Sequence, residues 1–290
     1  MSTKTVPERL PDLAADAERV ALLALAEDGP RDLTSEVCLE VDRLAAARIE
    51  FRGQGVLAGV AYADAVARLC GCTVAWLAEE GEPVQDRAVG RLGIGLAGIL
   101  LAERPLLNVL QRASGIATLT RACVDAVAGT GCGVLHTRKT APGLRLFDAA
   151  AVVAGGGQVH RLDLAHTVLI KDNHWRVLRE TGRSLAEALE TARGLGALEC
   201  QVEVESLEQL EEACAAGADR LLLDNQRPRM VRHWAERARA LRADIAIEAT
   251  GGITLSDIRG FAEAGADFVS LGALTHSVLA ANLSITLETI

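Results

Sequence analysis

The sequence QVEVESLEQLEEACAAGADRLLLDN, residues 201–225, contains two short strand-like runs separated by an amphipathic segment. Leu221–Leu223 is wholly apolar, and Gln201–Val204 carries Glu203 between two valines. Strands of a parallel sheet are buried on both faces and are therefore mostly apolar. Between the runs, Leu207–Ala216 has apolar residues at helical spacing. A strand, a helix and a second strand in this order predict one unit of an α/β barrel.

Further apolar runs occur on both sides of this stretch, and each ends at a polar or glycine-rich cluster. They are Val134–Leu135, Thr167–Ile170, Ile245–Ile247 and Phe268–Leu271, and a helix is expected over Ser256–Ala264. In (β/α) barrels the chemistry lies at the carboxyl ends of the strands. Here those ends carry Arg, Lys, His, Glu and Asp, so the second half of the chain is predicted to be an enzyme with an anionic substrate.

The composition favours a helix-rich α/β enzyme. The 290 residues are 50% hydrophobic and 3% aromatic, enough for one large or two unequal domains. A net charge of -9 argues against a general nucleic-acid binder. The seven Cys form no CxxC pair, so we expect free thiols in a reducing cytoplasm. No stretch resembles a signal peptide or a membrane span, so a cytoplasmic enzyme without a membrane partner is expected.

The first hundred residues predict a smaller α/β domain. Asp32 is a candidate helix cap, and a long helix from about Glu103 to Ala128 is expected to lead into the barrel. The predicted domains are residues 1–112 and 113–276, with the tail 277–290 packing back on the first. The other expected elements are helices over Leu10–Glu27 and Ala61–Cys70 and strands over Ala45–Arg52, Thr73–Leu77 and Ala88–Leu96.

Three clusters at strand ends supply positive charge. Thr137-Arg138-Lys139-Thr140 places two cations side by side, and a turn at a strand end can bring both into one mouth. His160-Arg161 follows Gly155-Gly156-Gly157, where the backbone can approach a ligand closely. Lys171 ends an apolar strand and is either a Schiff-base nucleophile or an anion anchor. The alternative for each cluster is a solvated surface loop.

Glu203 and Asp224 end successive strands, so their carboxylates are expected to converge over the barrel mouth. Mg²⁺ is commonly bound by one or two carboxylates together with substrate phosphates. The pair can also do acid–base work or stabilise a cation. Simple pairing with nearby Arg and Lys side chains is the alternative, and Glu205 on the same pleat face can replace Glu203.

Two glycine-containing turns follow the last strands. Thr250-Gly251-Gly252 and Gly272-Ala273 each precede a helical segment. Glycine turns and helix amino ends in this part of a barrel often bind phosphate.

Taken in order, these motifs resemble the quinolinate phosphoribosyltransferase family over nearly the whole chain. The resemblance implies an N-terminal α/β sandwich followed by an open, incomplete α/β barrel of the type II phosphoribosyltransferases. It also implies a homodimer or larger assembly in which the N-terminal region of one subunit covers its neighbour's barrel mouth. The motifs are Glu103-Arg104 with Asn108, Ser114–Thr118, Thr137–Arg145, Gly155–Gly157, His160-Arg161, Leu169–His174, Val202–Ser206, Leu223–Asn225, Gly251-Gly252 and Gly272–Ser277.

The resemblance implies a decarboxylating transfer reaction of NAD synthesis. The pyridine nitrogen of quinolinate attacks the ribose C1 of Mg²⁺-bound phosphoribosyl pyrophosphate, pyrophosphate leaves, and one carboxylate is lost as CO₂. The product is nicotinate mononucleotide.

The resemblance also implies roles for individual residues. Arg138, Arg161 and Lys171, with Arg104 from the neighbouring subunit, grip the substrate carboxylates, and Arg suits them because its fork is bidentate. Lys139 and His160 would lie against quinolinate or the phosphates. The catalytic set would be Lys139, Glu203 and Asp224, of which Glu203 and Asp224 contact the ribose and bind its metal. The 5-phosphate would be bound by Thr250, Gly251, Gly252, Gly272 and Ala273.

The chain departs from the family pattern beside these motifs. His136 stands where the family usually has an acidic residue, and Val159 where it usually has Asn. Asp163 and His166 stand where Gly and Asp are usual. These neighbours shape the acceptor pocket, so a paralogue that acts on another aromatic acid in specialised metabolism stays open.

Two readings from other classes are weaker. A non-catalytic anion-binding paralogue would not need Glu203 and Asp224. A Schiff-base aldolase would use Lys171 but not the cation clusters Arg138-Lys139 and His160-Arg161.

Overall fold

The computed structural model describes residues 10–288 and divides them into two compact units. The barrel unit comprises Ala122–Arg138 and Gln158–Ala273. The sandwich unit comprises residues 10–121, Lys139–Gly157 and residues 274–288. Helix α4 (Leu96–Ala126) runs from the sandwich unit into the barrel unit.

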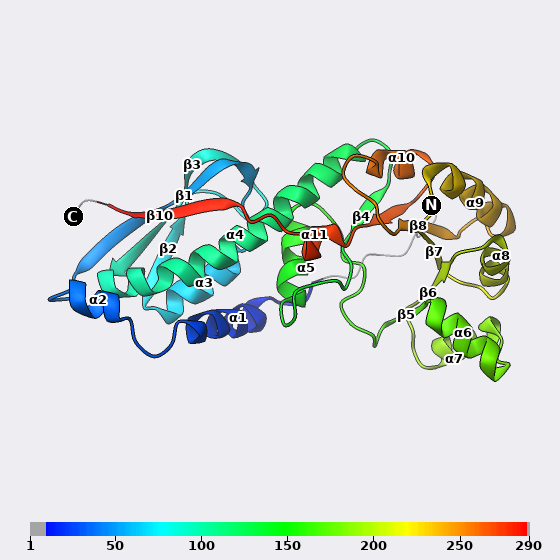
Figure 1. The fold of residues 1–290 in the computed structure, drawn as a ribbon, viewed down its shortest axis with the longest axis horizontal. Coiled ribbons are helices and arrows are strands. Elements are labelled where there is room, and N and C mark those ends of the chain that lie inside the picture. The colour runs from blue at the N-terminus through cyan, green and yellow to red at the C-terminus, as the bar shows by residue number, and fades with distance from the viewer. Residues whose placement is uncertain (1–9, 289–290) are drawn as a thin grey trace. The chain divides into compact units, whose positions relative to one another are not determined.

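The barrel unit contains a six-stranded parallel sheet in the order β4-β9-β8-β7-β6-β5 (Figure 1). β4 and β5 stand at the two ends of this order, so the sheet is open, and the predicted open α/β barrel is confirmed. The strands are β4 (Gly133–Leu135), β5 (Thr167–Ile170), β6 (Glu199–Val204), β7 (Arg220–Asp224), β8 (Ala246–Thr250) and β9 (Phe268–Ser270).

Burial on both faces explains the apolar runs. Every residue of β6 is buried, and β7 and β8 become partly exposed only at their last residues. Helix α8 (Leu207–Ala215) is capped by Ser206, whose hydroxyl accepts a hydrogen bond from Gln209 N and so satisfies one free amide of the first turn. The connecting helices are α6 (Asp172–Thr181), α7 (Leu185–Gly194), α8 (Leu207–Ala215), α9 (Pro228–Leu241) and α10 (Ile258–Glu263).

One predicted strand end is wrong. The run Ile245–Ile247 was expected to end at Glu248, but β8 continues to Thr250 and Glu248 lies inside the sheet, fully buried. The carboxylate is tolerated there because Arg220 and His160 lie beside it. A buried charge needs such partners.

The sandwich unit contains a four-stranded antiparallel sheet in the order β10-β1-β3-β2 (Figure 1). The C-terminal strand pairs with β1 from Ala47↔Leu287 to Arg52↔Asn282. Asp32 caps α2 by accepting hydrogen bonds from the amides of Thr34 and Ser35, which confirms the predicted cap. The strands are β1 (Leu44–Val56), β2 (Cys72–Trp76), β3 (Pro83–Gly95) and β10 (Asn282–Leu287), and the helices are α1 (Ala14–Glu27), α2 (Leu33–Cys38), α3 (Val60–Leu69), α5 (Arg145–Ala154) and α11 (Ala273–His276).

Helix α4 begins at Leu96, earlier than the predicted start at Glu103. Gly98 lies in its first turn, where a Cβ would lie 2.4 Å from Cys70 O. The glycine therefore permits close packing inside a helix. The predicted boundary at residue 112 falls within this helix, and the predicted domain division stays a prediction.

None of the helices between residues 10 and 288 is long and apolar enough to cross a membrane.

Candidate active site

Glu203 and Asp224 form an acidic pair at the carboxyl end of the parallel sheet. Glu203 is only 8% exposed in β6, and Asp224 is the half-buried last residue of the neighbouring β7. Burial raises the pKa of Glu203, and the charges of Asp224 and Asp172 raise it further, while Lys171 acts in the opposite direction. The two carboxylates are thus close enough to influence each other, as a cation-binding pair requires.

Lys171 lies between β5 and α6 and pairs with this acidic group. Its ammonium donates a hydrogen bond to Glu203 Oε2, and its backbone amide donates to His174 Nδ1 over 3.0 Å. Trp175 Nε1 donates to the Glu203 carbonyl over 2.9 Å, which holds α6 against β6. An ammonium paired with a carboxylate is an electrostatic anchor, whereas a Schiff-base nucleophile needs the neutral amine.

Arg138 and Arg161 form a cationic pair in the same unit. Arg161 is 9% exposed and donates to Thr167 O over 3.2 Å. Burial lowers the pKa of Arg161, and the nearby guanidinium of Arg138 lowers it further. Arg138 Nε is buried and has no hydrogen-bond partner in the described part of the chain. Two neighbouring guanidinium groups, one with an unsatisfied donor, have the chemistry to bind an anion.

His160 precedes Arg161 but faces a carboxylate of the barrel interior. Its Nε2 atom lies 3.3 Å from Glu248 Oε1. Sequence reasoning missed Glu248 and its partner Arg220. A charged residue inside an otherwise apolar strand was the available signal, because such a residue is buried only with partners.

The turn after β8 is the first predicted phosphate loop. Thr250 pairs in register with Asp224, so the turn follows directly at the acidic edge of the sheet. Gly251 and Gly252 have φ values of +87° and +63°, which favour glycine. A Cβ on Gly251 would lie 2.4 Å from Asn225 Oδ1, so this glycine is also required by space.

Gly272-Ala273 follow β9, the strand that neighbours β8 in the sheet. The two predicted phosphate loops therefore leave adjacent strands at the same edge.

Lys139 and the chain that follows it belong to the sandwich unit. The Lys139 carbonyl accepts a hydrogen bond from Thr275 Oγ1 over 2.8 Å. Two residues on, the amide of Ala141 donates to Asp148 Oδ2, a buried carboxylate that is also bound by Arg112. The backbone of this loop is thus anchored within its own unit, and the catalytic role of Lys139 stays a prediction.

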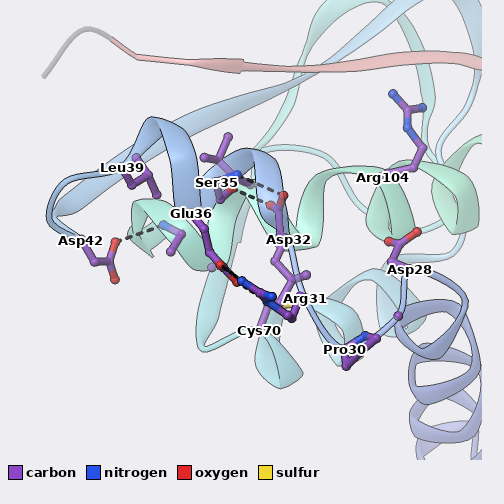
Figure 2. A pocket seen from close by; sticks show the side chains of 15 residues that line it. Asp28, Pro30, Arg31, Asp32, Ser35, Glu36, Leu39, Asp42, Cys70 and Arg104 are labelled. Carbon is purple, nitrogen blue, oxygen red and sulfur yellow. Dashed lines mark hydrogen bonds and ion pairs between the residues drawn. The ribbon is translucent and has the colours of Figure 1, made fainter.

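Arg104 is exposed on α4 in the sandwich unit and makes no hydrogen bond or ion pair with the described residues 10–288. It lines a cavity of about 740 Å³ together with Asp28 and Arg31. Figure 2 shows its guanidinium turned away from the Arg31–Glu36 ion pair. Its contribution to a neighbouring subunit stays a prediction.

Within residues 10–288 no group of three or more His, Cys, Asp and Glu side chains is arranged to hold a metal ion. Glu203 and Asp224 offer two oxygen ligand groups, which suit Mg²⁺ when a substrate supplies further oxygens.

The chain matches two family models that together cover most of its length. Residues 32–114 match the N-terminal domain of quinolinate phosphoribosyl transferase, and residues 116–286 match its C-terminal domain. The chain is 38% identical over 266 residues to a probable nicotinate-nucleotide pyrophosphorylase [carboxylating] of Bacillus subtilis, covering 90% of this chain and 89% of that protein. It is 36% identical over 288 residues to the Mycobacterium leprae nicotinate-nucleotide pyrophosphorylase [carboxylating], covering 96% and 100%.

Solved structures show the same similarity. The nicotinate-nucleotide pyrophosphorylase from Francisella tularensis superposes with a TM-score of 0.87 at 31% identity, covering 99% of each chain. NadC from Streptococcus pyogenes superposes with a TM-score of 0.86 at 32% identity, covering 97% of this chain and 100% of that one.

Proposed function

Because the chain belongs to the quinolinate phosphoribosyltransferase family, we propose that it transfers phosphoribose from phosphoribosyl pyrophosphate to quinolinate. The products are nicotinate mononucleotide, CO₂ and pyrophosphate, a step of NAD synthesis. The observation that carries the proposal is the pairing of opposite charges in one unit. Arg138 and Arg161 form a cationic pair beside the barrel strands, and Glu203 and Asp224 form an acidic pair at the strand ends.

The cationic pair binds and orients the acceptor. Quinolinate carries two carboxylates, and the planar forks of Arg138 and Arg161 match a carboxylate through parallel hydrogen bonds. Lys171 adds a third cation, which pairs with Glu203 and would also bind a carboxylate of the acceptor. His160 would lie against the acceptor or the phosphates, and the part of Lys139 in the reaction stays a prediction. Held in this way, the pyridine nitrogen is directed at the ribose C1, and positioning removes much of the entropic barrier.

The acidic pair stabilises the donor as the bond to pyrophosphate breaks. Positive charge develops on the ribose ring, and fixed carboxylates stabilise this charge most strongly in a site that excludes water. The turns Thr250–Gly252 and Gly272-Ala273 hold the 5-phosphate through backbone amides.

Glu203 and Asp224 would also hold Mg²⁺ together with oxygens of the donor. When bound, the metal would neutralise negative charge on the departing pyrophosphate. Two carboxylates of which one is buried fit this role, since Mg²⁺ is seldom held by an all-protein cage.

The assembly we propose is a homodimer or larger oligomer with shared active sites. Arg104 supports it, because this exposed cation has no partner within the described residues of its own chain. It would bind an acceptor carboxylate in the neighbouring subunit. We also propose a cytoplasmic location, which the free thiols support.

The departures from the family pattern do not oppose quinolinate as the acceptor. His136 is fully buried, with Nδ1 3.0 Å from Thr137 O. Val159 is buried as well, and Asp163 pairs with His166 over 3.2 Å. None of the four replaces a cation of the proposed carboxylate site.

The test is a turnover assay with Mg²⁺, phosphoribosyl pyrophosphate and a panel of pyridine mono- and dicarboxylates. Quinolinate is expected to give nicotinate mononucleotide with equal amounts of CO₂ and pyrophosphate. Turnover of another aromatic acid without turnover of quinolinate would transfer the function to a paralogous phosphoribosyltransferase.

A further inference from the structure

The interior of the barrel unit holds a buried charged cluster, which we define as Glu199, Arg220, Glu248 and His160. Arg220 on β7 lies between the two carboxylates: Nε is 3.0 Å from Glu199 Oε1, and Nη1 is 3.1 Å from Glu248 Oε2. Arg220 is 4% exposed and Glu248 is 0% exposed. The Arg220 guanidinium also lies 4.4 Å from the centre of the Phe268 ring. The cluster therefore sits in the packed core of the barrel.

The charges of the first three residues do not balance. Two carboxylates and one guanidinium leave one negative charge, and an unpaired buried charge is costly. Glu199 is well satisfied, because it accepts two hydrogen bonds from Arg220 and one from Gln201. The imbalance therefore falls on Glu248.

Among residues 10–288, the Oε1 atom of Glu248 is the carboxylate oxygen that still lacks a hydrogen-bond donor. It has no aligned hydrogen-bond donor in the described residues, and His160 Nε2 lies 3.3 Å from it. This distance is that of an ion pair rather than a well-formed hydrogen bond. The contact with His160 is attractive only when Nε2 carries a proton, because two lone pairs would otherwise face each other.

We propose that Glu248 is the positioning residue of His160: it holds a proton on Nε2 and fixes the rotation of the ring, so that Nδ1 faces the anionic ligand and, when the ring carries a second proton, donates a hydrogen bond to it. Arg220 and Glu199 hold Glu248 in place. Which ring nitrogen carries the proton is set by the partner of the other nitrogen. The expected effect on ligand binding rests on the proposed function, in which His160 contacts the acceptor or a phosphate.

The electrostatics of Glu248 agree with this arrangement. Burial by itself raises its pKa, but the nearby His160 and Arg220 outweigh burial and lower the pKa to about 2. The groups that face Glu248 are His160, Arg220, the hydroxyl of Ser270 and the more distant guanidinium of Arg161. Glu248 therefore stays ionised at neutral pH and can hold a proton on the imidazole.

The experiment compares Glu248→Gln with Glu199→Gln in the full-length protein. Both variants remove one carboxylate from Arg220, but only the first removes the partner of His160. Long-range proton–nitrogen NMR of histidine-labelled protein shows which ring nitrogen carries the proton, and His160→Gln assigns the signal. Quinolinate binding by equilibrium dialysis and thermal unfolding are measured on the same samples.

In the wild type the His160 Nε2 signal is expected to be that of a protonated nitrogen. Glu248→Gln should change both ring-nitrogen signals and weaken quinolinate binding on the order of 10–100-fold, as for carboxylates that orient metal-binding histidines. Glu199→Gln should lower the unfolding temperature but leave the His160 signals unchanged.

Three results would overturn the proposal. They are a wild-type His160 with a bare Nε2, a Glu248→Gln protein with unaltered ring signals, or a Glu199→Gln protein with the same change as Glu248→Gln. The first needs no variant to fold. The NMR readout needs no ligand, so failure of quinolinate turnover with the expected NMR result would count against the proposed function alone.

Discussion

Glu203 is subject to two opposing demands. It is buried, which favours the protonated carboxyl, and its proposed work with a cation needs the carboxylate. Its pKa is raised above the ordinary 4.5 by burial and by Asp224 and Asp172, against the effect of Lys171. A carboxyl with a raised pKa in the folded state stabilises the fold below that pKa and loses this contribution as the pH rises through it.

Glu203→Gln should therefore abolish turnover while leaving the free energy of unfolding at pH 7 unchanged or higher. In the wild type, activity should fall on the acid side at a pH above the ordinary 4.5 of a glutamate, because the carboxylate is lost there first. Urea unfolding and a pH–rate profile of kcat/KM measure the two effects. Glu205→Gln, at an exposed neighbour, is the control and should alter neither. A Glu203→Gln enzyme with normal kcat would contradict the role.

Lys171 is expected to act through its charge. Lys171→Met should raise the KM for quinolinate on the order of 10–100-fold, since hydrogen bonds to charged groups contribute about 1.5–3 kcal/mol and 1.4 kcal/mol is about tenfold. Steady-state kinetics measure this, and borohydride should trap no adduct. Arg176→Met, which removes an exposed cation of the same helix paired with Glu180, should leave KM unchanged. A trapped imine with a carbonyl substrate would instead favour an aldolase.

At the scale of elements, the turn after β8 depends on two glycines with different constraints. Gly251 has a φ of +87°, and a Cβ at this position would lie 2.4 Å from Asn225 Oδ1. Gly252 has a φ of +63°, and a Cβ there would meet open space. Gly252→Ala should cost about 1–2 kcal/mol from backbone strain alone. Gly251→Ala should cost more, because the side chain of Asn225 must also move.

Chemical unfolding ranks the two variants, and binding of ribose 5-phosphate tests the proposed loop. Binding should weaken more in Gly251→Ala than in Gly252→Ala. Equal binding by both variants and the wild type would show that the 5-phosphate is held elsewhere.

At the scale of the whole molecule, Arg104 is expected to serve a neighbouring subunit. Arg104→Ala and Lys171→Ala should each be nearly inactive alone. Mixed subunits should regain activity, because each mixed dimer then contains one site with both wild-type residues. Sedimentation gives the oligomeric state, and tagged subunits prove exchange.

A fully active monomer would refute shared active sites. So would a lack of recovery after proven exchange, because Arg104 would then act in its own subunit or have no catalytic part.

Local pattern determined most of the elements and an anionic substrate, and the family resemblance implied the reaction class. The run Thr167–Ile170 was predicted with the bounds that β5 has, because a short β-branched run before a polar cluster has few alternative structures. The cations and carboxylates at strand ends were likewise readable, since parallel strands bring their carboxyl ends to one edge. The order of the motifs that contain Arg138, Lys171 and Glu203 indicated the family.

Only the tertiary structure decided which charges neutralise one another. Glu248 was expected to end a strand and instead lies inside one, because Arg220 and His160 come from other parts of the chain to meet it. The long helix was expected to begin at about Glu103 but begins at Leu96, and Gly98 within it permits close approach to Cys70. In both cases the deciding neighbour is distant in sequence. The cost of a buried charge or an added Cβ depends on that neighbour, so it is set by strand register and helix packing and not by local composition.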